Sequence, residues 1–110
     1  DLETTGPRMA VDRIISIGAV AVSERAVRHD DAFERVLRQA ECSAVDNILI
    51  HQIGGQQQAG GREPAPALLD FLDYLGESVA LAFRAEFDAT VLGHEVELQL
   101  GVVQRVRRVE

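Results

Sequence analysis

Two carboxylates stand at the start of the chain, in the segment DLETTG at residues 1–6. On a β-strand, residues i and i+2 project from the same face, so Asp1 and Glu3 would lie side by side with Leu2 turned toward a core. Two carboxylates on one face repel each other unless a cation lies between them. The pair therefore indicates either a divalent metal site or an acidic, solvated terminus, and these six residues do not separate the two.

A third carboxylate, Asp88, follows an apolar segment at residues 78–83 that predicts a short buried strand. It also stands at the start of a helical pattern over residues 86–100, where acids suit the first turn. Ligand sites of open α/β sheets gather near strand ends. If the strand 78–83 lies beside the strand that carries Asp1 and Glu3, the third carboxylate reaches the same place.

The elements that would position these side chains begin with three strands. Residues 13–24 are rich in β-branched residues and apolar on both alternating sets, which is typical of a strand covered on both faces. One set consists of Ile15, Ile17, Ala19 and Ala21, and the other contains Ile14, Val20 and Val22. A second strand over about 27–37, entered through a turn near Glu24 and Arg25, would pair with it as an antiparallel hairpin.

The clearest helix is PAPALLDFLDYLGE at residues 64–77. Pro64 suits its first turn, leucines recur at i, i+4 and i+7 from Leu68, and Gly76 ends it. Residues 43–53 predict a short helical turn, and GGQQQAGG after them predicts a loop. With a closing strand after residue 100, the order predicts an α/β fold in which a hairpin sheet extends into parallel βαβ units.

Length and composition set limits on function. The 110 residues suffice for one domain with a core. The net charge of −7 argues against a broad basic face for nucleic acid, but not against an enzyme that meets phosphates through bound metal ions. The single Cys42 excludes an internal disulfide, and no apolar run reaches the roughly 18 residues of a membrane span. We expect a cytoplasmic protein with no membrane contact.

Four segments together resemble a known family. They are DLETTG at 1–6, DRIISIGAV at 12–20, LIHQI at 49–53 and FRAEFDATVL at 83–92. In order and spacing they resemble the first two motifs of the DEDD-type 3′–5′ exonucleases, and within these the proofreading epsilon-subunit-like (DnaQ-like) group. The resemblance covers nearly the whole chain. It implies a ribonuclease H-like fold, with a mixed sheet that starts as three antiparallel strands and continues as βαβ units with flanking helices.

The resemblance also implies an activity. Asp1, Glu3 and Asp88 match the family's catalytic carboxylates, which hold two divalent ions, Mg²⁺ or Mn²⁺, that clamp the scissile phosphate. The implied function is 3′–5′ exonuclease action on single-stranded DNA or RNA 3′ ends, with a polymerase or fused domains as further partners. The residues that match substrate-contacting positions are Leu2, Thr4, Thr5, Asp46, His51 and Phe87. For the two threonines, Asp46 and His51, a purely structural role stays open.

The sequence also departs from the family pattern. The chain starts on Asp1, and the family's third motif, with a base (His or Tyr) and a further Asp, is absent from residues 1–110 and is expected beyond Glu110. We therefore expect a single exonuclease-like domain over 1–110, incomplete at both ends and inactive alone. Gln52 replaces a Gly, and Arg84 stands where the family often has Asn. The alternatives are a degenerate module that binds nucleic acid or a protein without cleavage, and a purely structural domain.

Overall fold

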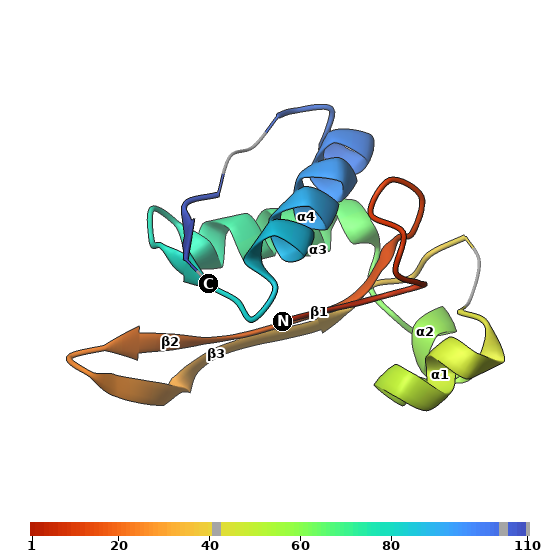
Figure 1. The fold of residues 1–110 in the computed structure, drawn as a ribbon, viewed down its shortest axis with the longest axis horizontal. Helices are drawn as coiled ribbons and strands as arrows, with labels where there is room; N and C mark the ends of the chain where they lie inside the picture. Colours follow the sequence, from red (N-terminus) through yellow and green to blue (C-terminus); the bar gives the residue numbers. More distant parts are fainter. Residues whose placement is uncertain (41–42, 104–105, 110) are drawn as a thin grey trace.

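The computed structural model describes residues 1–40, 43–103 and 106–109, with the backbone alone at residues 45–47. The elements are β1 (Leu2–Thr4), β2 (Ile14–Ser23), β3 (Ala26–Val36), α1 (Val45–His51), α2 (Gly55–Ala59), α3 (Pro64–Leu75), β4 (Ala80–Leu81), α4 (Ala85–Leu100) and β5 (Arg108–Val109). Figure 1 shows α3 and α4 on one side of the long β2–β3 hairpin, with α1 and α2 beyond the end opposite its turn.

The first three strands form an antiparallel sheet in the order β1-β2-β3, which confirms the predicted three-stranded start. The hairpin turn falls on Glu24 and Arg25, because Ser23 pairs with Ala26. Both turn residues have positive φ, 52° and 63°. Two central residues with positive φ are the mark of a type I′ turn, whose twist matches that of the flanking strands. The hairpin therefore closes where the sequence predicted.

β2 departs from regular alternation where it pairs with β1. The register shifts after Glu3, so that Ile15 is an additional residue on β2, a β-bulge. Because a bulge shifts the alternation by one, Ile14 and Ile17 both join the same core cluster. The predicted uninterrupted alternation, with Ile15 and Ile17 as equivalent members of one face, is therefore wrong at this point.

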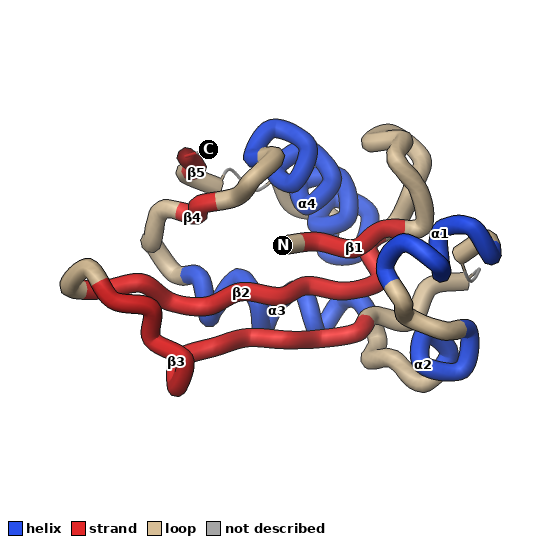
Figure 2. Tube along the Cα trace, turned by 60° about the horizontal axis from the view of Figure 1, so that its bottom comes forward, coloured by secondary structure: helices blue, strands red, loops and turns tan. Residues whose placement is uncertain are grey.

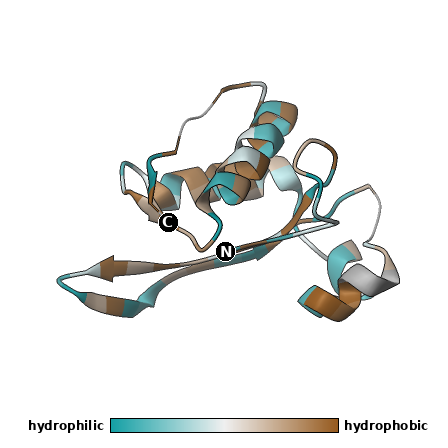
Figure 3. Cartoon of the chain, viewed as in Figure 1, coloured by the Kyte–Doolittle hydropathy of each residue, from teal (hydrophilic) through white to brown (hydrophobic). Residues whose placement is uncertain are grey.

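The second half of β2 is covered less than the sequence predicted. Ile14 has no solvent exposure, whereas Val20 is 44% exposed and Val22 57%. The hairpin extends past the ends of α3 and α4, which lie over its first half (Figure 1). Figure 3 shows hydrophobic residues in this projecting part of β2. The expectation of a strand covered on both faces along its whole length is wrong.

The core lies between the sheet and the two long helices. α3 begins at Pro64 and ends before Gly76, whose φ of 55° suits glycine at a helix end, as predicted. Leu68 is fully buried. α4 ends before Gly101, with a φ of 70°. The buried cluster consists of Ile14, Ile17, Phe33, Leu37, Ala67, Leu68, Phe71, Val91, Leu92 and Val96.

The polar segment GGQQQAGG is not the predicted loop, because residues 55–59 form the short helix α2. Its Gln58 is only 3% exposed. The side-chain amide of Gln58 accepts a hydrogen bond from the Ser43 N–H (3.0 Å) and donates one to the Ile53 carbonyl (2.8 Å). These bonds satisfy the buried amide and tie α2 to both ends of the α1 segment, which no composition argument could foresee.

β4, α4 and β5 form the predicted βαβ unit, since Ala80 pairs with Arg108 and Leu81 with Val109 in parallel. β4 is shorter than the predicted strand over 78–83, and Leu81 is 68% exposed, so the prediction of a buried strand is wrong. Among the described residues, no strand pairing joins β4–β5 to the three-stranded sheet (Figure 2). The mixed α/β architecture is thus confirmed, but as two sheets.

None of the described helices is long and apolar enough to cross a membrane; the longest, α4, has 16 residues.

Candidate active site

Asp1 is held against β2 by its backbone. Its α-amino group donates a hydrogen bond to the Gly18 carbonyl (2.6 Å), and its carbonyl accepts one from the Gly18 N–H (2.9 Å). Leu2 is partly buried against the core cluster, as the alternation predicted. Asp1 and Glu3 therefore project from the opposite face of β1, and the Asp1 side chain is exposed.

Asp88 lies in the first turn of α4, where its N–H bonds to the Arg84 carbonyl (2.9 Å). Burial raises the pKa of Asp88 above its usual value, because a carboxylate is harder to charge away from water. The positive charges of the Asp1 α-ammonium and of Arg84 act in the opposite direction without cancelling this rise. Both Leu2 of β1 and Phe87 of α4 pack against the core cluster.

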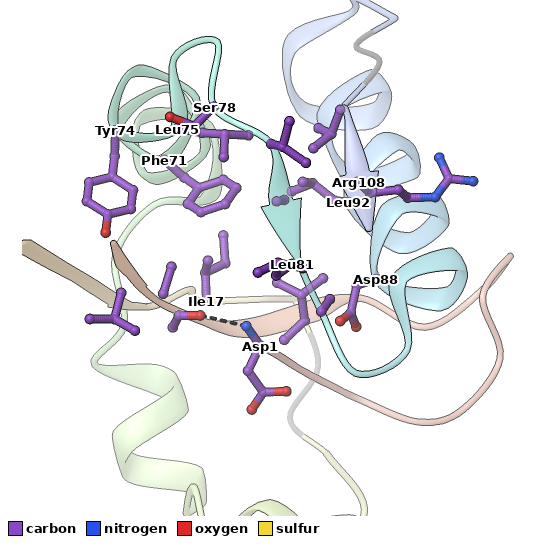
Figure 4. A pocket seen from close by; sticks show the side chains of 18 of the residues that line it. Asp1, Ile17, Phe71, Tyr74, Leu75, Ser78, Leu81, Asp88, Leu92 and Arg108 are labelled. Atoms are coloured by element: carbon purple, nitrogen blue, oxygen red, sulfur yellow. Dashed lines mark hydrogen bonds between the residues drawn. The ribbon is translucent and has the colours of Figure 1, made fainter. Parts of the chain in front are cut away.

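The two aspartates line one cavity of about 730 Å³. The cavity is lined by β2 from Ile17 to Val22 and by Ala80 and Leu81 of β4. Residues of α3 and α4 complete the wall, including Phe71 and Tyr74. Figure 4 shows Asp1 and Asp88 at one end of the cavity and Tyr74 at the other. The two aspartates thus line one cavity although β4 does not pair with β1 in the described residues, so the condition that the sequence set for their meeting is not met.

Glu3 is not brought into this group. It is absent from the residues that line the cavity. Among the residues that the structure describes, no three His, Cys, Asp or Glu side chains stand close enough to hold a metal ion together. The donor chemistry of Asp1 and Asp88 fits a divalent cation, since both residues line one cavity and carboxylate oxygens are hard ligands. Two of the three predicted ligands thus share a location, and their role stays a prediction.

Thr4 and Thr5 use their hydroxyls inside the turn that follows β1. The Thr4 hydroxyl donates to the Gly6 carbonyl. The Thr5 hydroxyl donates to Asp12 Oδ1 (3.0 Å) and accepts from the Arg13 N–H (2.9 Å). These bonds fit the structural alternative that the sequence left open, a turn-shaping role.

His51 is also occupied by internal hydrogen bonds. Its Nδ1 accepts from the Ile53 N–H (3.0 Å), so in the neutral ring the proton is on Nε2, which lies 3.1 Å from Ser43 Oγ. His51 does not line the cavity of Asp1 and Asp88. Its contacts fit a structural histidine. The side chain of Asp46 lies outside the described residues.

Phe87, the neighbour of Asp88, is partly buried against the core cluster. The guanidinium carbon of Arg84 lies 4.5 Å from the centre of the Phe87 ring, an attractive cation–π arrangement. Arg84 is exposed and close enough to lower the pKa of Asp88. The structure therefore places the positive charge of Arg84 near Asp88. Substrate contacts by Leu2 and Phe87 stay predictions.

Sequence reasoning missed two buried carboxylates, Asp12 and Glu95, which are 6% and 1% exposed. Burial opposes the charge of Asp12, but hydrogen bonds from Arg8 and Thr5 outweigh it, so the pKa of Asp12 is lowered. A weak signal existed for Glu95, because it stands seven residues after Asp88 and so on the same face of the helix. An acid on an inward helical face needs partners, but the sequence does not name them.

The mixed α/β fold, with an antiparallel three-stranded sheet followed by helices and a small parallel sheet, is that of the ribonuclease H-like class of exonucleases. The family model described as exonuclease (RNase_T) matches residues 1–104, almost the whole chain, and the chain belongs to this family. The DEDD-type resemblance of the sequence is thereby confirmed. A search of curated proteins finds no match to the chain.

Proposed function

We propose that this domain is a metal-dependent 3′–5′ exonuclease that acts on single-stranded 3′ ends of DNA or RNA, with Asp1, Glu3 and Asp88 as the metal ligands. Membership of the exonuclease family supports a nuclease in general. The observation that carries the finer proposal is that Asp1 and Asp88, far apart in the chain, line the same cavity.

The carboxylates suit this chemistry only together with cations. A phosphodiester is an anion, so acidic side chains repel it unless bound ions reverse the local field. Divalent ions such as Mg²⁺ or Mn²⁺ would supply that charge and activate a water molecule. The protein's part is to hold the ions: because Asp88 is partly buried, its ionised form gains from a nearby cation. Arg84, beside Asp88, offers a charge to a substrate phosphate.

A second candidate is a domain that binds nucleic acid or a protein partner without cleaving. Two observations favour it. No three carboxylates gather in the part of the chain that the structure describes. Arg84 and Gln52 depart from the family pattern.

The test uses the full-length natural protein with single-stranded oligonucleotides labelled at the 5′ or the 3′ end. We expect Mn²⁺-dependent release of nucleotides from the 3′ end. Asp88→Asn should reduce the rate at least about 100-fold, since even outer-shell changes at metal sites cost 10- to 100-fold. Asp70→Asn is the matched control, because it removes the same charge from an exposed position on α3.

A parallel thermal-stability measurement separates the two candidates. Mn²⁺ should raise the melting temperature of the wild type by binding the folded state, and Asp88→Asn should abolish the rise. Release of nucleotides from the 5′ end would contradict the proposed polarity. Oligonucleotide binding with neither cleavage nor a Mn²⁺ effect would favour the non-catalytic candidate.

A further inference from the structure

Glu95, in the middle of α4, is a carboxylate enclosed by donors. Its oxygens accept hydrogen bonds from Arg13 Nε (3.0 and 3.2 Å) and from Arg13 Nη2. They also accept from the Ile14 N–H (3.0 Å), Gln39 Nε2 (3.3 Å) and Gln99 Nε2 (3.1 Å). A carboxylate offers about four acceptor sites, so this one is fully used. None of these contacts is needed by the metal chemistry proposed above.

The contact is an ion pair rather than a neutral hydrogen bond. Burial opposes the charge of Glu95, but the bonds from Arg13, Ile14 and Gln99 outweigh it and lower the pKa of Glu95. The hydrogen bond to Glu95 raises the pKa of Arg13 in turn. The Arg13 side chain is 30% exposed and that of Glu95 2%, so Glu95 depends on this partner for its charge.

The residues next to Arg13 connect the pair to β1. Asp12 binds the Thr5 hydroxyl, and the Arg13 N–H donates to the same hydroxyl (2.9 Å). Thr5 comes two residues after Glu3. The short segment from Asp12 to Ile14 therefore forms hydrogen bonds with Thr5, just after β1, and with α4. It is a hydrogen-bonded link between the two elements next to the proposed ligands.

Because Asp88 and Glu95 are on the same helix, the contact of Glu95 affects the position of Asp88. Asp88 and Glu95 are seven residues apart, so they lie on the same helical face and about 10.5 Å apart along the axis. With Glu95 as the pivot, a tilt of the helix by only about 5° would move Asp88 by about 1 Å over that lever. A displacement of about 1 Å in a catalytic constellation can cost roughly 100-fold in rate.

We propose that Glu95 and Arg13 are positioning residues, whose buried contact fixes α4 against β2 and so sets the separation between Asp88 and Asp1. The consequence for catalysis rests on the proposed function, whereas the consequence for the separation does not. Asp88 is also attached to β4 through the start of α4, but β4 makes no strand pairing with β1 in the described residues. The Glu95 contact therefore adds a polar link between α4 and the start of β2 to the apolar packing of Val91, Leu92 and Val96.

The test compares Glu95→Gln with Val96→Ala in the full-length protein. Val96 is the next residue of α4 and is fully buried, so its truncation destabilises the same helix without touching Arg13. We expect Glu95→Gln to lower kcat on a single-stranded oligonucleotide roughly 10- to 100-fold with KM within about twofold. Val96→Ala should keep kcat within about twofold, even if it lowers the melting temperature as much as Glu95→Gln does.

A milder variant covers the case in which Glu95→Gln does not fold. Arg13→Lys keeps the charge but loses the planar fork, and it should lower kcat by an intermediate factor. The double variant Arg13→Lys/Glu95→Gln should lose no more than Glu95→Gln alone, because the two side chains act through one contact. Equal losses of kcat in Val96→Ala and in the variants of the pair would overturn the positioning role.

Crystal structures of the wild type and of the folded variants separate this inference from the proposed function. If the wild type shows no Mn²⁺-dependent cleavage, the proposed function fails. The positioning role then depends on the distance between the Cα atoms of Asp1 and Asp88. A change of about 1 Å in a variant of the pair, absent from Val96→Ala, supports it. An unchanged distance refutes it.

Discussion

Gly6, the last residue of the opening DLETTG segment, packs directly against a buried carboxylate. A Cβ atom at this position would lie 2.6 Å from Asp12 Oδ2 and 2.9 Å from both Oδ1 and Cγ. Real Cβ atoms do not approach other atoms so closely. Asp12 is 6% exposed and bound in place, so Gly6→Ala should force its carboxylate out of its hydrogen bonds.

The size of the effect follows from the bonds that Asp12 makes. Its carboxylate accepts from the Thr5 hydroxyl (3.0 Å) and from the Arg8 N–H (2.7 Å), and bonds to a charged group contribute about 1.5 kcal/mol each. The side-chain ion pair with Arg8 adds little, because that side chain is 70% exposed. Alanine restricts the unfolded chain and so returns about 0.7 kcal/mol. We expect a net loss of roughly 2–3 kcal/mol, or about 10 °C in Tm.

Urea unfolding and thermal melts followed by circular dichroism measure this loss. Gly18→Ala is the matched control within the sheet, because the nearest atom to its Cβ would be the Asp1 carbonyl oxygen at 4.0 Å. It should cost less than about 0.5 kcal/mol. In an Asp12→Ala background, Gly6→Ala should cost little, since the clash is gone. If Gly6→Ala destabilises that background as much as the wild type, the steric reasoning is wrong.

The remaining predictions concern acid, the core and the α1 segment. The pKa values of Asp12 and Glu95 are lowered by folding, so their stabilisation is present above the ordinary carboxyl range and is lost as the pH falls below about 4; urea midpoints at pH 7 and pH 3.5 measure this. Leu68→Ala should cost about 2–5 kcal/mol in urea unfolding, whereas Leu69→Ala, at a 56% exposed position, should stay within about 0.5 kcal/mol. His51→Ala should cost about 1–3 kcal/mol by leaving the Ile53 N–H without its acceptor, and a rise in KM with unchanged stability would instead indicate a substrate contact.

Local patterns carried the parts of the fold that depend on neighbours in the chain. The helix from Pro64 to Leu75 followed from its proline start, its leucine spacing and Gly76. The hairpin turn at Glu24 and Arg25 followed from the strands predicted on either side of it. These elements are decided by residues a few positions apart, so the sequence alone could place them.

Predictions from local patterns failed where the local structure depends on contacts with residues far away in the sequence. Alternation along β2 could not reveal the bulge at Ile15, because the bulge exists only in the pairing with β1. The composition of residues 54–61 is typical of a loop, but the hydrogen bonds of Gln58 with Ser43 and Ile53 hold part of this segment in a helix. The run over 78–83 reads as a buried strand, yet its exposure depends on which sheet it joins.

For the candidate site, the sequence by itself determined which carboxylates are available, that Asp1 and Glu3 share a face of one strand, and the exonuclease family. Only the tertiary structure decided that Asp1 and Asp88 meet across a cavity and that Glu3 stands apart from them. It also decided that Glu95 forms an ion pair with Arg13, 82 positions away in the chain. Side-chain type and local spacing can be read from the sequence, whereas the distance between residues far apart in the chain depends on how helices and strands pack.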